Sequence, residues 1–114
     1  MPPAEQTSIT FEQFQQVQLR VGRVLEAEPV PGADKLLRLM VELGEAQPRQ
    51  VVAGLAPNFT AEELVGRTVV VVANLEPATI RGVQSNGMIL AVGGQQPLAL
   101  VTVDRDCAPG EKVR

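Results

Sequence analysis

The chain has 114 residues, of which 45% are apolar, and this suits one globular domain with a single core. A net charge of −3, the lack of histidine and a single cysteine argue against a polycation, histidine-based catalysis and a structural zinc site. The apolar run from Val69 to Ala73 is far shorter than the ~20 residues of a membrane-spanning helix, and no signal peptide is visible. We therefore expect a cytoplasmic protein without a membrane partner.

The N-terminal residues predict an arm followed by a short helix. Residues 1–8 are polar and proline-containing, which is typical of a flexible arm or linker. Thr10 and Gln13 form a capping-box pattern that starts a helix. Phe11 and Phe14 lie on one face of this helix, and we expect them to plug the core rather than stack on bases.

Alternating apolar residues predict a long strand over residues 17–28. Gly22 inside it indicates a bend of the kind that helps to close a small barrel. A loop rich in proline and glycine is expected over residues 29–32. The side chains expected to face inward are those of Val17, Leu19, Val21, Leu25 and Ala27.

The remaining pattern predicts further short strands and one more helix. Thr60 and Glu63 form a second capping box, and Gly66 suits the end of that helix. Inward positions of the second strand are Leu37, Leu39, Val41 and Leu43. The strands are expected over residues 36–43, 49–53, 68–73, 88–92 and 98–103. This order predicts an all-β domain with short helices, an OB-fold five-stranded barrel, with a small β-sandwich as the alternative.

The stretch from Val69 to Val92 organises the prediction of a site. Two buried strands are joined by an irregular polar segment, and loops held by rigid strands often carry binding residues. The alternative interpretation is that this segment only connects the two strands and has no binding function. The side chains expected to lie close together are those of Asn74, Arg81, Ser85, Asn86 and Met88.

The sequence contains no recognisable catalytic or cofactor-binding arrangement. Ser85 has no histidine to activate it, and neither a GxGxxG nor a Walker A sequence occurs. We expect no enzymatic activity, no cofactor, no metal and no DNA partner. Acidic residues are interleaved with the basic ones and aromatic residues are few, so any RNA binding should depend on the shape and backbone of a folded molecule.

Two segments carry a resemblance to a known family. LRVGRVLEAEPVPGADKLL and RQVVAGLAPNFTAEELVGRTVVVVANLEPATIRGVQSNGMILA are similar to the tRNA-binding domain that is appended to many methionyl-tRNA synthetases and also occurs as a free-standing protein. The resemblance runs from about Ile9 to the C-terminus, which defines a domain over residues 9–114. It implies an OB-fold barrel whose additional C-terminal strands form a homodimer interface. It also implies binding to the outer corner of tRNA by shape, without amino-acid specificity.

The resemblance also implies which residues bind tRNA. Its Ser-x-Gly-Met motif falls on residues 85–88, and its Asn-Leu motif starts at residue 74. Relatives often carry lysine where this chain has Glu76 and Thr79, which predicts weaker phosphate contact. The expected tRNA-binding residues are Asn74, Ser85 and Met88 at the mouth, and Lys35, Arg38 and Arg81 at phosphates, with Arg49 as a further basic candidate.

Three alternatives remain open at this point. The chain is either free-standing or joined to a synthetase catalytic domain. It is either a tRNA binder or a dimerisation module with weak tRNA affinity. A chaperone-like peptide-binding protein of the same fold is the third possibility.

Overall fold

The computed structural model describes residues 7–56 and 58–114. The arm predicted over residues 1–8 falls mostly outside these ranges, because residues 1–6 are not among them. In the described part of the chain, no helix is long and apolar enough to cross a membrane.

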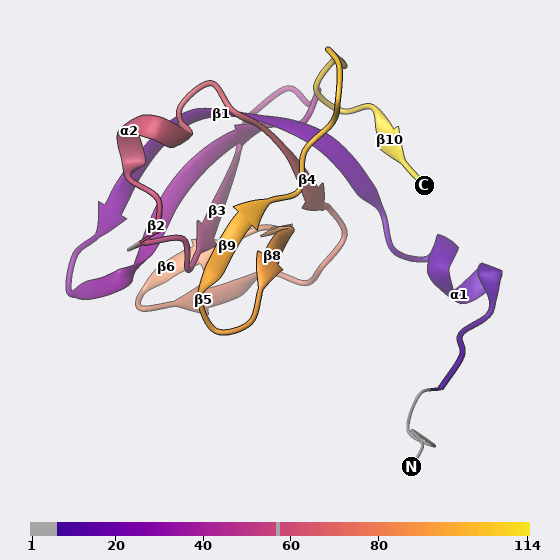
Figure 1. Cartoon of the computed structure of the whole chain (residues 1–114), viewed down its shortest axis with the longest axis horizontal. Helices are drawn as coiled ribbons and strands as arrows, with labels where there is room; N and C mark the ends of the chain where they lie inside the picture. Colours follow the sequence, from indigo (N-terminus) through magenta and orange to yellow (C-terminus); the bar gives the residue numbers. More distant parts are fainter. Residues whose placement is uncertain (1–6, 57) are drawn as a thin grey trace.

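Five antiparallel strands form the barrel, in the spatial order β3-β2-β1-β4-β7 (Figure 1). The short helix α2 (Ala61–Leu64) connects β3 to β4, as in an OB-fold. The strands are β1 (Leu19–Val30), β2 (Ala33–Glu42), β3 (Arg49–Ala53), β4 (Thr68–Val72) and β7 (Met88–Ile89). The predicted OB-fold barrel is therefore confirmed, and the β-sandwich alternative is not the observed architecture.

Two hydrogen bonds link β3 to the segment that precedes β7. The backbone N–H of Val52 donates to Oγ of Ser85 at 3.0 Å, and the N–H of Asn86 donates to the carbonyl of Gln50 at 2.8 Å. These bonds take the place of a regular ladder between the first and last strands of the sheet. Barrel closure thus depends on the loop that carries the predicted site.

The core confirms the alternation predicted for β2. Leu37, Leu39, Val41 and Leu43 are all buried, each with at most 3% of its surface exposed. They pack in one cluster with residues of β3, β4 and α2. The α2 residue in this cluster, Leu64, is fully buried. The alternation of apolar residues predicted the buried side chains correctly, because one face of β2 lines the barrel interior.

The inward face predicted for β1 is only partly correct: Ala27 packs against the core cluster as expected, whereas Val21 and Leu25 do not. Gly22 and Val24 face the interior, whereas Val21 is buried on the opposite face and Leu25 is 41% exposed. A Cβ atom at Gly22 would lie 2.7 Å from a methyl carbon of Val41, so only glycine fits at this inward-facing position. A bulge after Val24 shifts the register again. Both irregularities break the simple alternation that the prediction assumed.

The predicted core role of the N-terminal phenylalanines is also wrong. Helix α1 (Phe11–Gln15) begins with the expected capping box of Thr10 and Gln13 but buries none of its residues. It lies outside the barrel, on the N-terminal side of β1 (Figure 1). Phe11 is 72% exposed and Phe14 is 37% exposed. Local capping chemistry forms this helix, but no barrel surface covers its apolar face.

Short strands complete the chain. The segment predicted to be irregular contains a hairpin of β5 (Ala78–Ile80) and β6 (Val83–Ser85). The strand predicted over residues 88–92 is divided between two sheets, because Leu90 separates β7 from β8 (Ala91–Gly93). The last strands are β9 (Pro97–Leu100), which pairs with β8, and β10 (Lys112–Val113), which pairs with β1.

Candidate nucleic-acid interface

A tight two-residue turn joins β5 to β6, and its first residue is an arginine, which is unusual at this position. Arg81 has φ +54° and Gly82 has φ +81°, and two positive φ values at these positions are typical of a type I′ turn. Such turns favour asparagine or glycine, because a larger L-residue in the left-handed region is strained. Arg81 is the only non-glycine residue with positive φ in the described ranges. Strain at an exposed charged residue points to a functional reason for keeping it.

A small apolar cluster fixes the hairpin on the barrel. Ile80 and Val83, which flank the turn, pack against a buried group made by Val30, Ala33 and Val52. This group belongs to the ends of β1 and β2 and to β3. The turn of the hairpin is therefore held beside the turn that joins β1 to β2.

This packing brings two of the predicted phosphate-binding residues together. Lys35 and Arg81, far apart in the sequence, line one hollow of about 430 Å³. Asp34 lines the same hollow, so the local charge is only mildly positive. Lys35 and Arg81 are both exposed. Lysine and arginine are the side chains that most often contact phosphate oxygens in nucleic-acid complexes.

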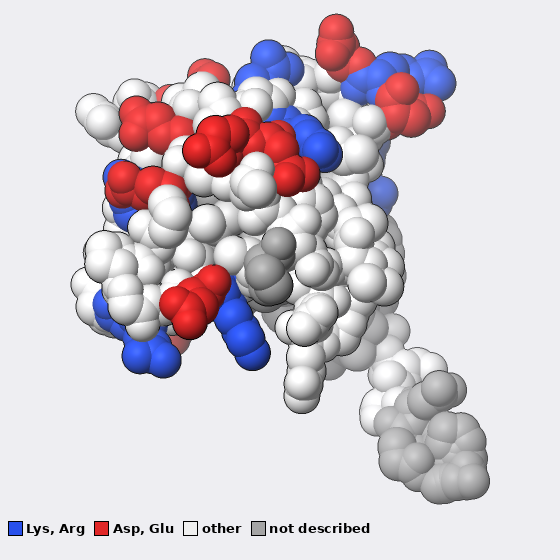
Figure 2. Space-filling view, turned by 60° about the vertical axis from the view of Figure 1, so that its left-hand side comes forward, with Lys and Arg blue, Asp and Glu red and all other residues white. Residues whose placement is uncertain are grey.

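Arg38, the third predicted phosphate ligand, already has an acidic partner. Its Nε donates to Oε1 of Glu28 on the neighbouring strand at 2.8 Å, and the Arg38 side chain is only 25% exposed. The wider surface is mixed as well. On the face turned forward in Figure 2, acidic side chains gather over the upper part with basic ones beside and above them, and side chains of both signs lie along the lower edge. Attraction of RNA on this face must therefore be local rather than general.

Ser85 lies inside the barrel wall. It is 5% exposed, and its hydroxyl accepts the N–H of Val52 at 3.0 Å and donates to the carbonyl of Gly87 at 3.0 Å. These two bonds join β3 to the start of β7. The direct RNA contact predicted for Ser85 stays a prediction, whereas its role in shaping the loop follows from the geometry.

Gly87 lies close to β4, and Met88 is an exposed apolar side chain beside it. A Cβ atom at Gly87 would lie 3.1 Å from a methyl carbon of Val71, so the backbone passes directly over β4. Met88 pairs with Val72 in the sheet, yet 45% of its surface is exposed. It lines a hollow of about 360 Å³ with residues 52–55 and 89–95. Met88 is therefore not a core residue.

Asn74 is used as a bridge within the protein. Its Oδ1 accepts the backbone N–H of Gln18 at 2.8 Å, and its Nδ2 donates to the carbonyl of Gln16 at 2.6 Å. These bonds attach the connection between α1 and β1 to the end of β4. Asn74 is not among the residues that line the hollow shared by Lys35 and Arg81.

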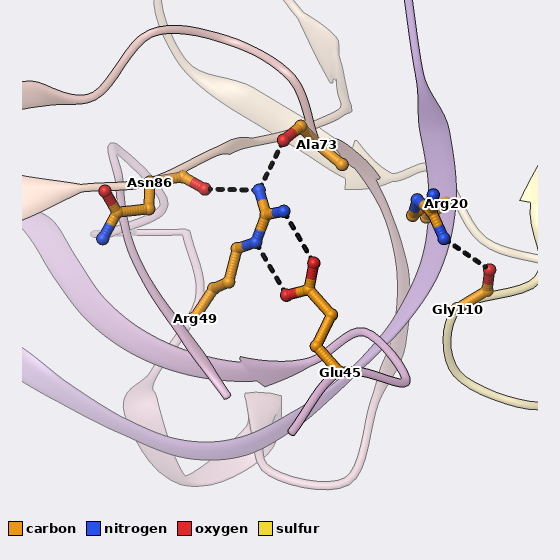
Figure 3. Close-up of polar contacts among 6 residues, drawn as sticks. All are labelled: Arg20, Glu45, Arg49, Ala73, Asn86 and Gly110. Atoms are coloured by element: carbon orange, nitrogen blue, oxygen red, sulfur yellow. Dashed lines mark hydrogen bonds and ion pairs between the residues drawn. The ribbon is translucent and has the colours of Figure 1, made fainter. Parts of the chain in front are cut away.

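Arg49 has a role that its sequence context did not reveal. Its Nε and Nη2 donate to the two carboxylate oxygens of Glu45 at 2.9 and 2.8 Å, and its Nη1 donates to the carbonyls of Ala73 and, at 3.2 Å, Asn86 (Figure 3). The hydrogen bond from Arg49 lowers the pKa of Glu45, and the bond to Glu45 raises the pKa of Arg49. The guanidinium is thus bonded to groups of the protein itself, while 26% of the side chain remains exposed.

Comparison with known proteins identifies the family. Residues 19–112 match the family described as "Putative tRNA binding domain". The chain is 52% identical over 110 residues to the methionine–tRNA ligase of Thermotoga maritima, covering 96% of this chain and 17% of that protein. The corresponding ligase of Methanocella arvoryzae is 49% identical over 106 residues, covering 93% and 15%. The chain therefore spans about one sixth of the length of these curated relatives.

Two solved structures show the same architecture. A MetRS-related protein from Pyrococcus horikoshii superposes with a TM-score of 0.87 at 30% identity, covering 95% of this chain and 99% of that one. The chaperone CsaA from Bacillus anthracis superposes with a TM-score of 0.85 at 26% identity, covering 95% and 100%.

Proposed function

Because the chain belongs to the tRNA-binding domain family, we propose that it recognises the folded shape of tRNA without reading amino-acid identity. It corresponds to the non-catalytic tRNA-binding region of proteins related to methionyl-tRNA synthetase. In this proposal it works in the cytoplasm, either free-standing or joined to a synthetase catalytic domain. Its task is to hold tRNA, while any aminoacylation belongs to that other domain.

The hollow shared by Lys35 and Arg81 is the observation that supports this function most directly. Lys35, near the start of β2, and Arg81, at the hairpin turn, line it together, and Arg81 is kept in a strained backbone conformation. The backbone at both positions is held by the buried cluster of Val30, Ala33 and Val52, so the spacing between the two points of attachment is set before RNA arrives. Preset spacing between cations suits the backbone of a structured RNA better than that of a flexible strand.

The same charges predict moderate affinity. Asp34 shares the hollow, Glu28 pairs with Arg38, and Arg49 is occupied by Glu45. Few phosphates can then be neutralised, so the logarithm of affinity should fall with a shallow to moderate slope against the logarithm of salt concentration. A slope that corresponds to the release of ten or more counterions would contradict this prediction of few phosphate contacts.

We also propose that two copies form a dimer through the C-terminal strands. Val92 on β8 is 53% exposed and Leu98 on β9 is 73% exposed, so this small sheet carries apolar side chains at its surface. Short sheets with open edges favour pairing with another strand. Light scattering at micromolar concentration should give twice the 12.2 kDa chain mass. A monomeric mass under these conditions would refute the dimer.

The similarity to CsaA supports a second candidate, a chaperone-like peptide binder. The exposed Met88 and its hollow would then contact an unfolded chain, since methionine suits variable apolar partners. Weak tRNA affinity in a mainly dimerising module is the third reading. These candidates differ in which partner binds best.

A competition assay separates the tRNA binder from the chaperone-like peptide binder. Labelled folded tRNA is bound to the protein and displaced by unlabelled folded tRNA, by the same RNA in unfolded form, or by a denatured protein. Displacement by folded tRNA at the lowest concentration supports the proposed function. Stronger displacement by the denatured protein supports the chaperone, and equal displacement by both RNAs removes the claim of shape recognition.

A further inference from the structure

We infer that the Glu45–Arg49 pair is a positioning element that fixes the β4–β7 loop, residues 73–87, in the form that meets RNA. This inference rests on the proposed tRNA-binding function. Neither residue needs to touch RNA for the effect. The loop contains Arg81 at its hairpin turn and leads directly into Met88, so its placement decides where both side chains lie.

One nitrogen atom of Arg49 holds both ends of this loop. Its Nη1 donates to the carbonyl of Ala73, the first residue of the loop, and to the carbonyl of Asn86, the last residue but one (Figure 3). The β4–β7 ladder stops at the pair Val72 and Met88, just beside these carbonyls. Arg49 therefore supplies the hydrogen bonds that the ladder no longer provides where the chain separates into the loop.

Glu45 orients this guanidinium. Both of its carboxylate oxygens accept hydrogen bonds from Arg49, at 2.8 and 2.9 Å, in the planar two-point geometry that arginine and carboxylate share. With Nε and Nη2 held in this way, Nη1 has a fixed direction toward the loop carbonyls. Lysine is a single point of charge and cannot hold a carboxylate and two carbonyls in one plane. The arrangement thus requires arginine and its acid together.

The position of the pair explains why it acts on the loop as a whole. Glu45 lies in the turn between β2 and β3, and Arg49 begins β3. The same strand holds the loop again through the N–H of Asn86, which donates to the carbonyl of Gln50, and through Nε2 of Gln50, which donates to the carbonyl of Gln84 at 2.8 Å. The loop is thus attached to the rigid start of β3 at consecutive points, of which Arg49 is the one that carries charge.

The alternative hypothesis is that Arg49 binds phosphate directly. The two hypotheses predict opposite changes in RNA affinity for the substitution Glu45→Gln. If Arg49 positions the loop, Glu45→Gln weakens RNA binding, because the guanidinium loses its orienting partner. If Arg49 contacts phosphate, Glu45→Gln strengthens binding, because the competing carboxylate is gone. The exposed Glu26, which is not a partner of Arg49, provides a matched control, since Glu26→Gln removes the same charge.

The experiment uses the full 114-residue chain and folded tRNA, with hydrogen exchange measured in the RNA-free protein. Arg49→Lys and Glu45→Gln should each weaken tRNA binding about tenfold and speed amide exchange in residues 73–87, with exchange in β2 unchanged. Glu26→Gln should leave loop exchange as in the parent. Tighter binding by Glu45→Gln, or loop exchange that is unchanged in both variants, would overturn the inference.

The exchange measurement also keeps this inference separate from the proposed function. If the parent protein does not bind tRNA, the proposed function fails, while faster loop exchange in the two variants would still establish the positioning role. If Arg49→Lys unfolds the protein, Glu45→Gln decides the question, because it preserves the shape of the side chain while it removes the charge and one of the two acceptor oxygens.

Discussion

Replacing Arg81 by asparagine should stabilise the protein and weaken RNA binding at the same time. Arg81 occupies the left-handed region at φ +54°, where asparagine is several-fold more frequent than larger residues. That preference corresponds to about 0.5–1 kcal/mol, and the exposed arginine has little packing to lose. For a domain of this size the gain amounts to an increase of about 2–6 °C in Tm. Thermal unfolding followed by circular dichroism measures it.

The expected loss of tRNA binding in Arg81→Asn can be measured from the salt dependence of the affinity. Removing one cation from the hollow shared with Lys35 should lower the slope of log affinity against log salt by about one unit. Fluorescence anisotropy with labelled tRNA at several salt concentrations gives that slope. Arg81→Lys is the matched control, because it keeps both the charge and the strained backbone and should leave Tm and slope nearly unchanged. A lower Tm for Arg81→Asn would refute the strain argument, and an unchanged slope would refute the phosphate contact.

Three further outcomes are expected. Ser85→Ala leaves the buried N–H of Val52 without its acceptor and should cost about 1–3 kcal/mol in denaturant unfolding, so an unchanged midpoint would contradict the structural role of the hydroxyl. Met88→Ala should cost less than ~1 kcal/mol, because the side chain is 45% exposed; a loss of ~2–5 kcal/mol, as for a buried methionine, would contradict that placement. Arg49 lowers the pKa of Glu45, so their stabilising interaction is present above the ordinary carboxyl pKa of 4.5 and is lost as pH falls through the lowered value. Stability measured from pH 6 to pH 2 should therefore fall less in Glu45→Gln than in the parent, and equal losses would argue against the pair.

Local chemistry explains the parts of the fold that were predictable. The capping boxes at Thr10 and Thr60 involve residues three positions apart, and both form as expected. The alternation in β2 also needs only the strand itself, because one face of it is buried along its length. The turn at Gly82 follows from glycine's tolerance of positive φ. Each of these features is decided within a few residues of chain.

The failures have a common physical origin. Phe11 and Phe14 form the apolar face that a core helix would have, but whether such a face is covered depends on where the rest of the chain lies. The inward side of β1 changes at Gly22 because Val41, on another strand, fills the space in which a side chain would lie. Neither fact is visible in the local pattern, since both depend on contacts between distant segments.

The candidate site divides along the same line. The residue pattern indicated a barrel of short strands with an irregular polar segment between two of them, and the family resemblance indicated Lys35 and Arg81 as basic candidates. The folded structure was needed to show that these two share a hollow, that the hydroxyl of Ser85 faces the barrel wall, and that Arg49 is bonded to Glu45 and to both ends of the loop. The reason is that a charge or a hydroxyl has no fixed role of its own. Its partners are the polar groups that chain packing brings within about 3 Å, and those groups come from remote positions in the sequence.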